Sequence, residues 1–247
     1  MKTYTFLDAW NIARKQVTSA TEADHAAIVC NLALNEIWNS WDWREALDDL
    51  PPFYLIPSEQ DHGAPAVVIP TDFMGLREAF LICTNSEPAY RQELEVIKDL
   101  RLIHGRQIPH AIGYEPSKNV FRLFPRVPDS FTPPHYMVDG IYKKRPTKIT
   151  SDNLSTPLPF DDVFLSVSVE AIKWAGMRIG GDPRAGEVQI RQNGQRVYTG
   201  QYAIMKERIE EMAQTEAVDL GNPVIAPREA YPRTRGGGSG TSGVYWY

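Results

Sequence analysis

Residues 31–50 read NLALNEIWNSWDWREALDDL and join a helical pattern to a strand-rich one. Trp38, Trp41 and Trp43 lie close together in this stretch and make up half of the six tryptophans of the chain. Burying one such side chain stabilises a fold by roughly 2–3 kcal/mol. We therefore expect the stretch to be a fixed point that sets the angle between two parts of the molecule.

Two helices are predicted before the junction. Thr5 is a suitable N-cap with Asp8 in the first turn, which predicts a helix to about Val17. A second helix is expected to begin near Thr21, another suitable N-cap. Its apolar residues recur at helical spacing and are Ala27, Cys30, Leu34, Ile37, Trp38 and Trp41. The place of Cys30 in this stripe predicts an inert core thiol.

A second row on the same helix is polar. Asn31, Asn35 and Asn39 follow one another at intervals of four residues, which places them on one side of a helix. Two interpretations stay open: a solvated edge, or a polar seam against a neighbouring subunit.

Residues 43–158 are expected to form an inserted, antiparallel β-rich domain. Prolines are too dense there for helices, and the turns between short apolar runs favour a meander. AIGYEP and VFRLFP, on either side of a turn at Pro116–Asn119, indicate a hairpin. His62 is expected in a turn, and residues 90–102 fit a strand or a short helix. The expected strands are Phe53–Ile56, Ala66–Ile69, Arg77–Cys83, Ala111–Tyr114, Val120–Phe124 and Tyr136–Tyr142.

Helical patterns return after Phe160. Asp161 or Asp162 can cap a helix that Gly180-Gly181 end. A further helix is expected from about Arg196 to Glu216, with the stripe Val197, Tyr202, Met205, Ile209 and Met212. The predicted fold class is α+β: residues 1–42 and 159–218 form a helical bundle, residues 43–158 are inserted, and residues 219–247 form an extended C-terminal arm.

The arm combines a glycine–serine linker with an apolar tip. The tip consists of Val244, Tyr245, Trp246 and Tyr247. Because aromatic side chains at a terminus gain by docking, the tip is a candidate partner-binding segment. The alternative is a flexible end without a partner.

Composition and motifs give no case for catalysis. The formal net charge of −5 argues against a broad basic surface for nucleic acid. The histidines and cysteines lack metal-ligand spacing, and the GxGxxG at residues 238–243 has no strand before it and no room for a helix after it. We therefore expect no catalytic residue, no metal and no cofactor. The absence of an apolar run of eighteen residues predicts no membrane partner.

Seven segments occur in a characteristic order. They are VCNLALNEIWNSWDWREAL, LPPFYLIP, AVVIPTDFMGLREAFLI, LEVIKDLR, IPHAIGYEPSKNVFRLFPRVPD, YMVDGIYKKRPTKIT and LPFDDVFLSVSVEAIKWAG. The series resembles the head-to-tail adaptor proteins of tailed bacteriophages, especially the tail-tubular type of short-tailed phages. The resemblance covers roughly residues 5–216. No single segment is specific to the family; the order of the segments carries the likeness.

The resemblance implies a structural function. Such adaptors form a ring of about twelve copies beneath the portal protein, join it to a nozzle or tail protein below, and line the channel through which genomic DNA passes as cargo. The expected location is the neck or tail of the virion, after assembly in the host cytoplasm. Subunit packing is expected through Trp38, Trp41, Trp43, Asn31, Asn35 and Asn39. Glu207, Glu210 and Glu211 are channel-lining candidates, with an ordinary solvated helix face as the alternative.

Two other classes of protein remain as alternatives. A tail-associated binding module would recognise the host surface through the β-rich insertion. A hydrolase carried in the virion would need paired carboxylates or a metal triad, for which the sequence shows no suitable spacing. Rings in micrographs favour the adaptor, glycan binding by a monomer favours the module, and turnover of peptidoglycan favours the hydrolase.

Overall fold

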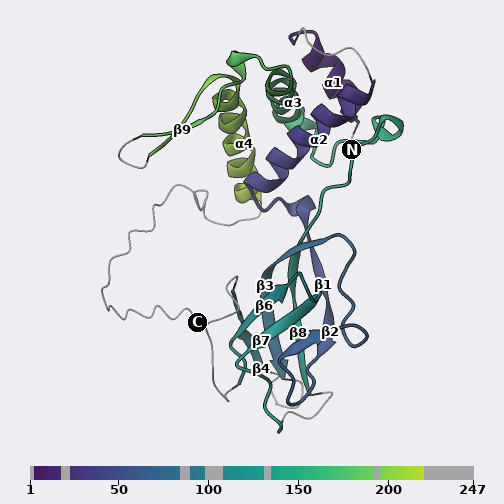
Figure 1. Cartoon of the computed structure of the whole chain (residues 1–247), viewed down its shortest axis with the longest axis vertical. Coiled ribbons are helices and arrows are strands. Elements are labelled where there is room, and N and C mark those ends of the chain that lie inside the picture. Colours follow the sequence, from purple (N-terminus) through teal and green to yellow (C-terminus); the bar gives the residue numbers. More distant parts are fainter. Residues whose placement is uncertain are drawn as a thin grey trace.

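Helices gather at one end of the molecule and two β-sheets at the other (Figure 1). The structure is a computed structural model that describes residues 3–17, 23–83, 90–97, 108–130, 135–191 and 195–219. Its buried apolar residues form two separate clusters, one among the helices and one between the sheets. The predicted α+β class, with helices from both ends of the chain and antiparallel strands between them, is confirmed.

The helical part begins with α1 (Phe6–Arg14) and α2 (Ala23–Ser40). Thr5 caps α1 as predicted, because its side chain accepts a hydrogen bond from the Asp8 amide while the Asp8 carboxylate accepts one from the Thr5 amide. The predicted N-cap of the second helix, Thr21, lies outside the described residues. The predicted apolar stripe of α2 faces the helical core, and Cys30 is fully buried there.

Helix α3 (Leu165–Ile179) lies in the middle of the helical part and packs against α1, α2 and α4 (Gly200–Asp219). Gly180 and Gly181 end α3 as predicted. The predicted acidic cap is wrong. A short 3₁₀ turn (Asp162–Phe164) precedes α3, and the side chain of Asp161 caps nothing. The Asp162 carboxylate instead accepts bonds from the backbone amides of residues 3 and 4.

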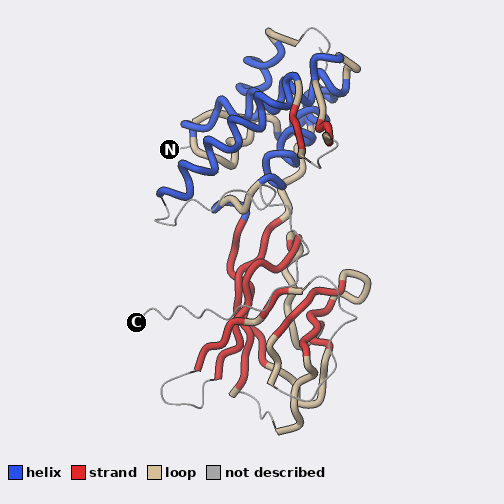
Figure 2. Tube along the Cα trace, turned by 90° about the vertical axis from the view of Figure 1, so that its left-hand side faces the viewer, coloured by secondary structure: helices blue, strands red, loops and turns tan. Residues whose placement is uncertain are grey.

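The β part contains two four-stranded sheets. In the first, β1 (Leu47–Tyr54), β8 (Tyr136–Lys144), β3 (Phe73–Cys83) and β4 (Tyr90–Glu93) lie in that order and are antiparallel. The second has the order β2 (Asp61–Gly63), β7 (Val120–Phe124), β6 (Ala111–Glu115) and β5 (Glu95–Val96). The ribbons of the two sheets lie beside each other in Figure 2.

Aromatic side chains fill the space between the two sheets. Phe53 of β1 stacks on Phe121 of β7 with ring centroids 5.5 Å apart. Phe73 of β3 meets Tyr114 of β6 edge to face at 4.7 Å. Such pairs add about 0.5–1.5 kcal/mol each beyond the area they bury. The β part therefore has a core of its own, separate from the helical core.

The sequence located the predicted β6–β7 hairpin and part of β1, β3 and β8, but two predictions about the strands are wrong. The strands do not form a meander, because β1 pairs with β8 across almost the whole insertion and β5 pairs with β6 in parallel. Ala66–Ile69 forms no strand but a turn and bend, with Val67 buried and Val68 exposed. The sequence leaves residues 90–102 open between strand and helix; Tyr90–Glu93 and Glu95–Val96 form strands, and residues 98–102 lie outside the described residues.

His62 lies in strand β2 and not in a turn. It is fully buried, and its Nε2 accepts a hydrogen bond from the Ile56 amide at 3.1 Å. Burial lowers the pKa of the imidazole, because the charged form loses its hydration. His62 is therefore a neutral core residue that fixes the chain between β1 and β2.

The prediction of a helix from about Arg196 is wrong at its start. β9 (Val188–Ile190) and β10 (Arg196–Tyr198) pair as a two-stranded ribbon, and α4 begins only at Gly200. The rest of the predicted stripe is buried in α4: Tyr202, Met205, Ile209 and Met212. Val197 belongs to the ribbon.

Candidate functional site

Two chain segments connect the helices to the sheets and form what we call the joint, residues 41–46 and 143–149. The Trp43 ring is 0% exposed and meets Phe160 edge to face at 5.7 Å. Its indole Nε1 donates to the Ile37 carbonyl of α2 at 2.7 Å. The Trp38 indole donates to the Lys144 carbonyl at 2.8 Å. Trp43 thus ties the first segment of the joint, residues 41–46, to the end of α2. Trp38 ties the same end of α2 to the second segment, residues 143–149.

A buried lysine ties the two segments of the joint to each other. Lys143, at the end of β8, is 2% exposed, and its ammonium donates to the Trp41 carbonyl at 2.6 Å. The same Nζ lies 3.2 Å from the Asp42 carboxylate, which also pairs with Arg77 of β3 at 2.7 Å. Burial lowers the pKa of Lys143, while Asp42 opposes that shift. Sequence analysis missed this ion cluster because its members are far apart in the chain.

Asn31 binds the second segment of the joint, residues 143–149, to α2. Its Nδ2 donates to the Ile149 carbonyl at 2.6 Å and to the Ala27 carbonyl at 2.8 Å, and its Oδ1 accepts from the Ile149 amide at 2.9 Å. A side-chain amide that satisfies both backbone groups of one residue fixes that residue in place. Asn31 is therefore a structural member of the joint.

Replacing Asn31 with alanine is expected to lower the free energy of unfolding by about 1–3 kcal/mol, because the part-buried Ile149 amide and carbonyl lose their partners. Asn35→Ala is the matched control. Asn35 is one turn further along the same helix and is exposed, so we expect a change within about 0.5 kcal/mol. Urea denaturation followed by circular dichroism measures both values. Equal losses in the two variants would contradict this role of Asn31.

The residues predicted to pack subunits together differ in exposure. Trp38 and Trp43 are buried in the helical core of the same chain, and Asn31 is bonded within it. Trp41 is partly exposed, and Asn35 and Asn39 are exposed. A contact of this set with a second subunit stays a prediction, and Asn35 and Asn39 have the most exposed side chains to offer it, whereas Trp41 and Asn31 are partly exposed.

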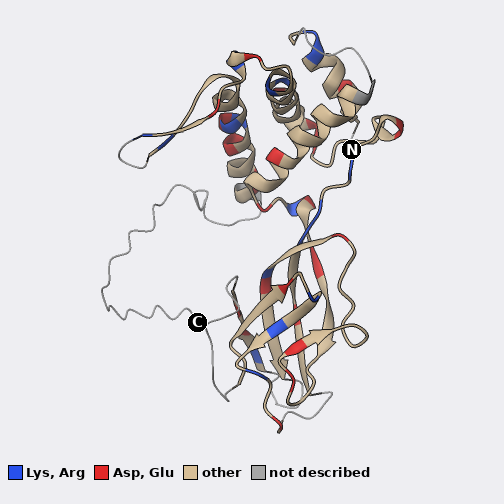
Figure 3. Ribbon diagram, in the orientation of Figure 1, with Lys and Arg blue, Asp and Glu red and all other residues tan. Residues whose placement is uncertain are grey.

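The three predicted channel-lining glutamates are exposed residues of α4, a helix on which Figure 3 shows both acidic and basic positions. Glu211 pairs with Arg208 at 2.6 Å, whereas Glu207 and Glu210 are exposed without an ion pair in the described part of the chain. This placement fits both a lumen-facing row and an ordinary solvated face. The tip, Val244 to Tyr247, lies outside the described residues.

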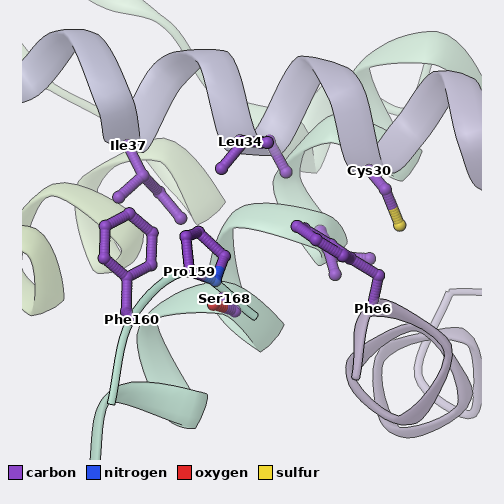
Figure 4. A pocket seen from close by; sticks show the side chains of 9 residues that line it. Phe6, Cys30, Leu34, Ile37, Pro159, Phe160 and Ser168 are labelled. Atoms are coloured by element: carbon purple, nitrogen blue, oxygen red, sulfur yellow. The ribbon is translucent and has the colours of Figure 1, made fainter. Parts of the chain in front are cut away.

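Figure 4 shows a small cavity in the helical core, lined by mostly apolar side chains from α1, α2 and α3 and by Pro159 and Phe160, with Ser168 among them. Its volume of about 10 Å³ has room for a single water molecule at most. The Cys30 thiol at its wall is neutral, because burial raises the pKa of Cys30 to about 12. The cavity is a packing defect and not a ligand site.

Within the described residues, no group of three or more His, Cys, Asp or Glu side chains is arranged to hold a metal ion. No helix in the same part of the chain combines the length and the apolar character that crossing a bilayer requires. The distinctive geometry is instead the joint, which ties the helical core to the β core through hydrogen bonds within the chain. A connection of this kind suits a structural protein.

Comparison with known families agrees with this class. The model of the SU10 adaptor protein family matches residues 14–227, so the chain belongs to the SU10 adaptor protein family. Its members are phage adaptor proteins, which gives the chain a structural role in the virion. The resemblance predicted from the order of segments is thereby confirmed. No curated protein matches the chain.

Proposed function

We propose that the chain forms a ring of about twelve copies beneath the portal protein. The ring joins the portal to a nozzle or tail protein below and surrounds the DNA ejection channel. The observation that carries the proposal is the match to an adaptor family over residues 14–227. The helical and β parts of the chain are also bound to each other at the joint, by Trp38, Trp43, Asn31 and Lys143. A rigid joint suits a ring whose two faces hold different partners.

The charge of the chain supports a conduit for DNA. The formal net charge is −5, and like charge prevents the phosphate backbone from adhering to the wall. Glu207, Glu210 and Glu211 are exposed along one helix and form the candidate lumen row. DNA is then cargo that passes and not a bound ligand.

The C-terminal arm is the proposed portal anchor. Each aromatic side chain at its tip can bury roughly 150–250 Å², at about 25 cal/mol per Å². Ordering each residue of the arm costs about 1–2 kcal/mol, so one arm binds weakly. A ring presents many identical arms together, and this multivalency makes the attachment firm.

Deleting residues 236–247 is expected to abolish co-sedimentation of the chain with purified portal rings, because each copy loses its aromatic tip. A matched control replaces residues 236–243 with another glycine–serine sequence of equal length and keeps Val244 to Tyr247, and it should bind as the unchanged chain does. Negative-stain images of the complex test the ring itself. Undiminished binding by the deletion variant would reject the arm as the anchor, and absence of binding by the unchanged chain would reject the portal as the partner.

A further inference from the structure

The sheet formed by β1, β8, β3 and β4 carries apolar side chains on both of its faces. Leu81 of β3 pairs with Val138 of β8, and both lie in the core between the two sheets. Because neighbouring residues of a strand point to opposite faces, the next pair, Ile82 and Met137, lies on the face turned away from that core. We call this the outer face. An antiparallel sheet with one face in water normally alternates apolar and polar residues, and the run AFLIC at residues 79–83 does not.

Five apolar side chains lie on the outer face, and none of them belongs to the core between the sheets. The strand register places them in three neighbouring strands: Tyr54, Phe80, Ile82, Met137 and Ile141. Tyr54 is 54% exposed, and the other four are half-buried. The described helices lie at the other end of the molecule, so none of them covers this face (Figure 2). The outer face is therefore an apolar surface that a partner can bury.

Carboxylates outnumber cations on the same face. Each of the four strands contributes one acidic side chain to it: Asp49, Glu78, Glu93 and Asp139. The cation among them is Arg91, whose guanidinium lies 3.8 Å from the centroid of the Phe80 ring and 3.8 Å from the Asp139 carboxylate. The formal charge of these four acids and Arg91 is −4 + 1 = −3. Toward the helices the face ends at Lys143, which the joint covers.

Asp139 has an unused acceptor on this face. Its Oδ1 is shielded from water and accepts no hydrogen bond from the described residues. The 3.8 Å to Arg91 is too long for a hydrogen bond. Because a shielded carboxylate oxygen without a donor is unfavourable, a cationic side chain that reaches Asp139 stabilises the complex it belongs to.

The charge of the outer face selects the kind of partner. Two copies of the chain cannot cover each other through this face, because like charges would meet. The chain as a whole also has a formal charge of −5, so a basic surface is expected from a different protein. A surface that presents lysine or arginine beside aliphatic or aromatic side chains fits both the carboxylates and the apolar side chains of the face.

We propose that the outer face binds a basic, apolar surface of a second virion protein. The proposal rests on the proposed function, for which it names a docking surface on the β part and the chemistry of its partner. Three rows of residues about 7 Å apart, on four strands about 5 Å apart, give a face of roughly 300 Å². A stable complex of two chains buries roughly 800 Å² on each partner, so this contact gains strength from its repetition around a ring.

Thiol labelling in assembled virions tests the contact. Tyr54→Cys is made in a Cys83→Ser background, and the buried Cys30 is kept. A maleimide is expected to label Tyr54→Cys at least about tenfold more slowly in the virion than in the free chain, because a covered thiol reacts only when the contact opens. The control is Val68→Cys, which is 72% exposed in the β part but lies outside the face and should keep its rate. An unchanged rate at Tyr54→Cys, or equal slowing at both positions, would overturn the proposal.

Neutralising two carboxylates tests the predicted charge of the partner. Asp49→Asn and Glu78→Gln, added to Tyr54→Cys, should make labelling in the virion about threefold faster, since the partner's cations lose two counter-charges. The matched control is Asp152→Asn with Asp161→Asn, two exposed carboxylates of the helical part, and it should leave the slow rate unchanged. Circular dichroism shows that both double variants are folded. The same rate in both would overturn the predicted basic character of the partner.

The free chain tests two other occupants of the face. Labelling of Tyr54→Cys is followed at rising chain concentration and, separately, with duplex DNA, and both rates should equal that of the dilute chain. Slowing by concentration alone would assign the face to a second copy, and slowing by DNA would assign it to nucleic acid. Either result would overturn the proposal.

The two proposals fail in distinguishable ways. If the chain co-sediments with portal rings but Tyr54→Cys reacts in the virion as fast as in the free chain, the adaptor function stands and the outer-face contact is wrong. If labelling is slow in the virion but the chain does not bind portal rings, the outer-face contact stands and the portal attachment is wrong.

Discussion

Trp43→Ala is expected to lower the free energy of unfolding by about 3–5 kcal/mol. The side chain is fully buried where α2, Phe160 and the joint meet, and its indole donates to the Ile37 carbonyl. Alanine leaves both a cavity and an unpaired carbonyl at the end of α2. Urea denaturation followed by tryptophan fluorescence and by circular dichroism measures the loss, and the two probes together show whether the helical and β parts still unfold as one unit.

Trp41→Ala is the matched control. The Trp41 side chain is only partly buried, and its carbonyl, which accepts the Lys143 hydrogen bond, is kept by alanine. We expect a loss of about 1 kcal/mol. Sequence analysis treated the three tryptophans as equivalent, whereas the structure ranks Trp43 first. Equal losses in both variants, or a stable Trp43→Ala protein with unchanged rings, would show that the joint does not depend on Trp43.

Sequence reasoning succeeded where a signal is local. The capping box of Thr5 and Asp8, the apolar stripe of α2 and the glycine pair after α3 each lie within a few residues, and each predicted its element. The joint could not be predicted this way, because Lys143 reaches a carbonyl 102 positions earlier and Asn31 binds a residue 118 positions later. Pairings of this kind depend on the tertiary fold and leave no pattern in one sequence.

The pairing of the strands could not be predicted for the same reason. Periodicity located the β6–β7 hairpin, whose two strands are joined by a short turn, but it carries no information that β1 pairs with β8. A short apolar run is also ambiguous: Ala66–Ile69 has β-branched residues, yet only Val67 is buried. The sequence predicts a turn at His62, whereas the side chain is buried in strand β2 and accepts a hydrogen bond from the Ile56 amide.

The ribbon was missed although the sequence contains a signal for it. Asn193-Gly194 between VQIRQ and QRVY is a strong hairpin pattern. Because Val197 also fits the helical spacing that continues from Tyr202, the predicted helix begins too early and covers the second strand of this hairpin. The hairpin was therefore readable from residue types, but its direction away from the helices was not.

Gly186→Ala is expected to displace the ribbon and to lower the free energy of unfolding by at least about 3 kcal/mol. Gly186 has φ 71° and ψ 177°, a region that is nearly exclusive to glycine and costs other residues about 1–3 kcal/mol. A Cβ at this position would also lie 1.9 Å from the Thr199 carbonyl oxygen. That carbonyl is backbone at the base of the ribbon, so the base itself must move.

The control is Gly181→Ala, because Gly181 also has a positive φ of 69° but a Cβ there meets nothing within 4 Å. It should lose about 1–2 kcal/mol of stability, less than Gly186→Ala, since it lies at the end of α3 and leaves the ribbon base unchanged. Helical circular dichroism should persist in both variants, because the residues buried in the helical core are the same. Urea denaturation followed by circular dichroism measures both losses. Equal losses in the two variants would contradict the steric role of Gly186 at the base of the ribbon.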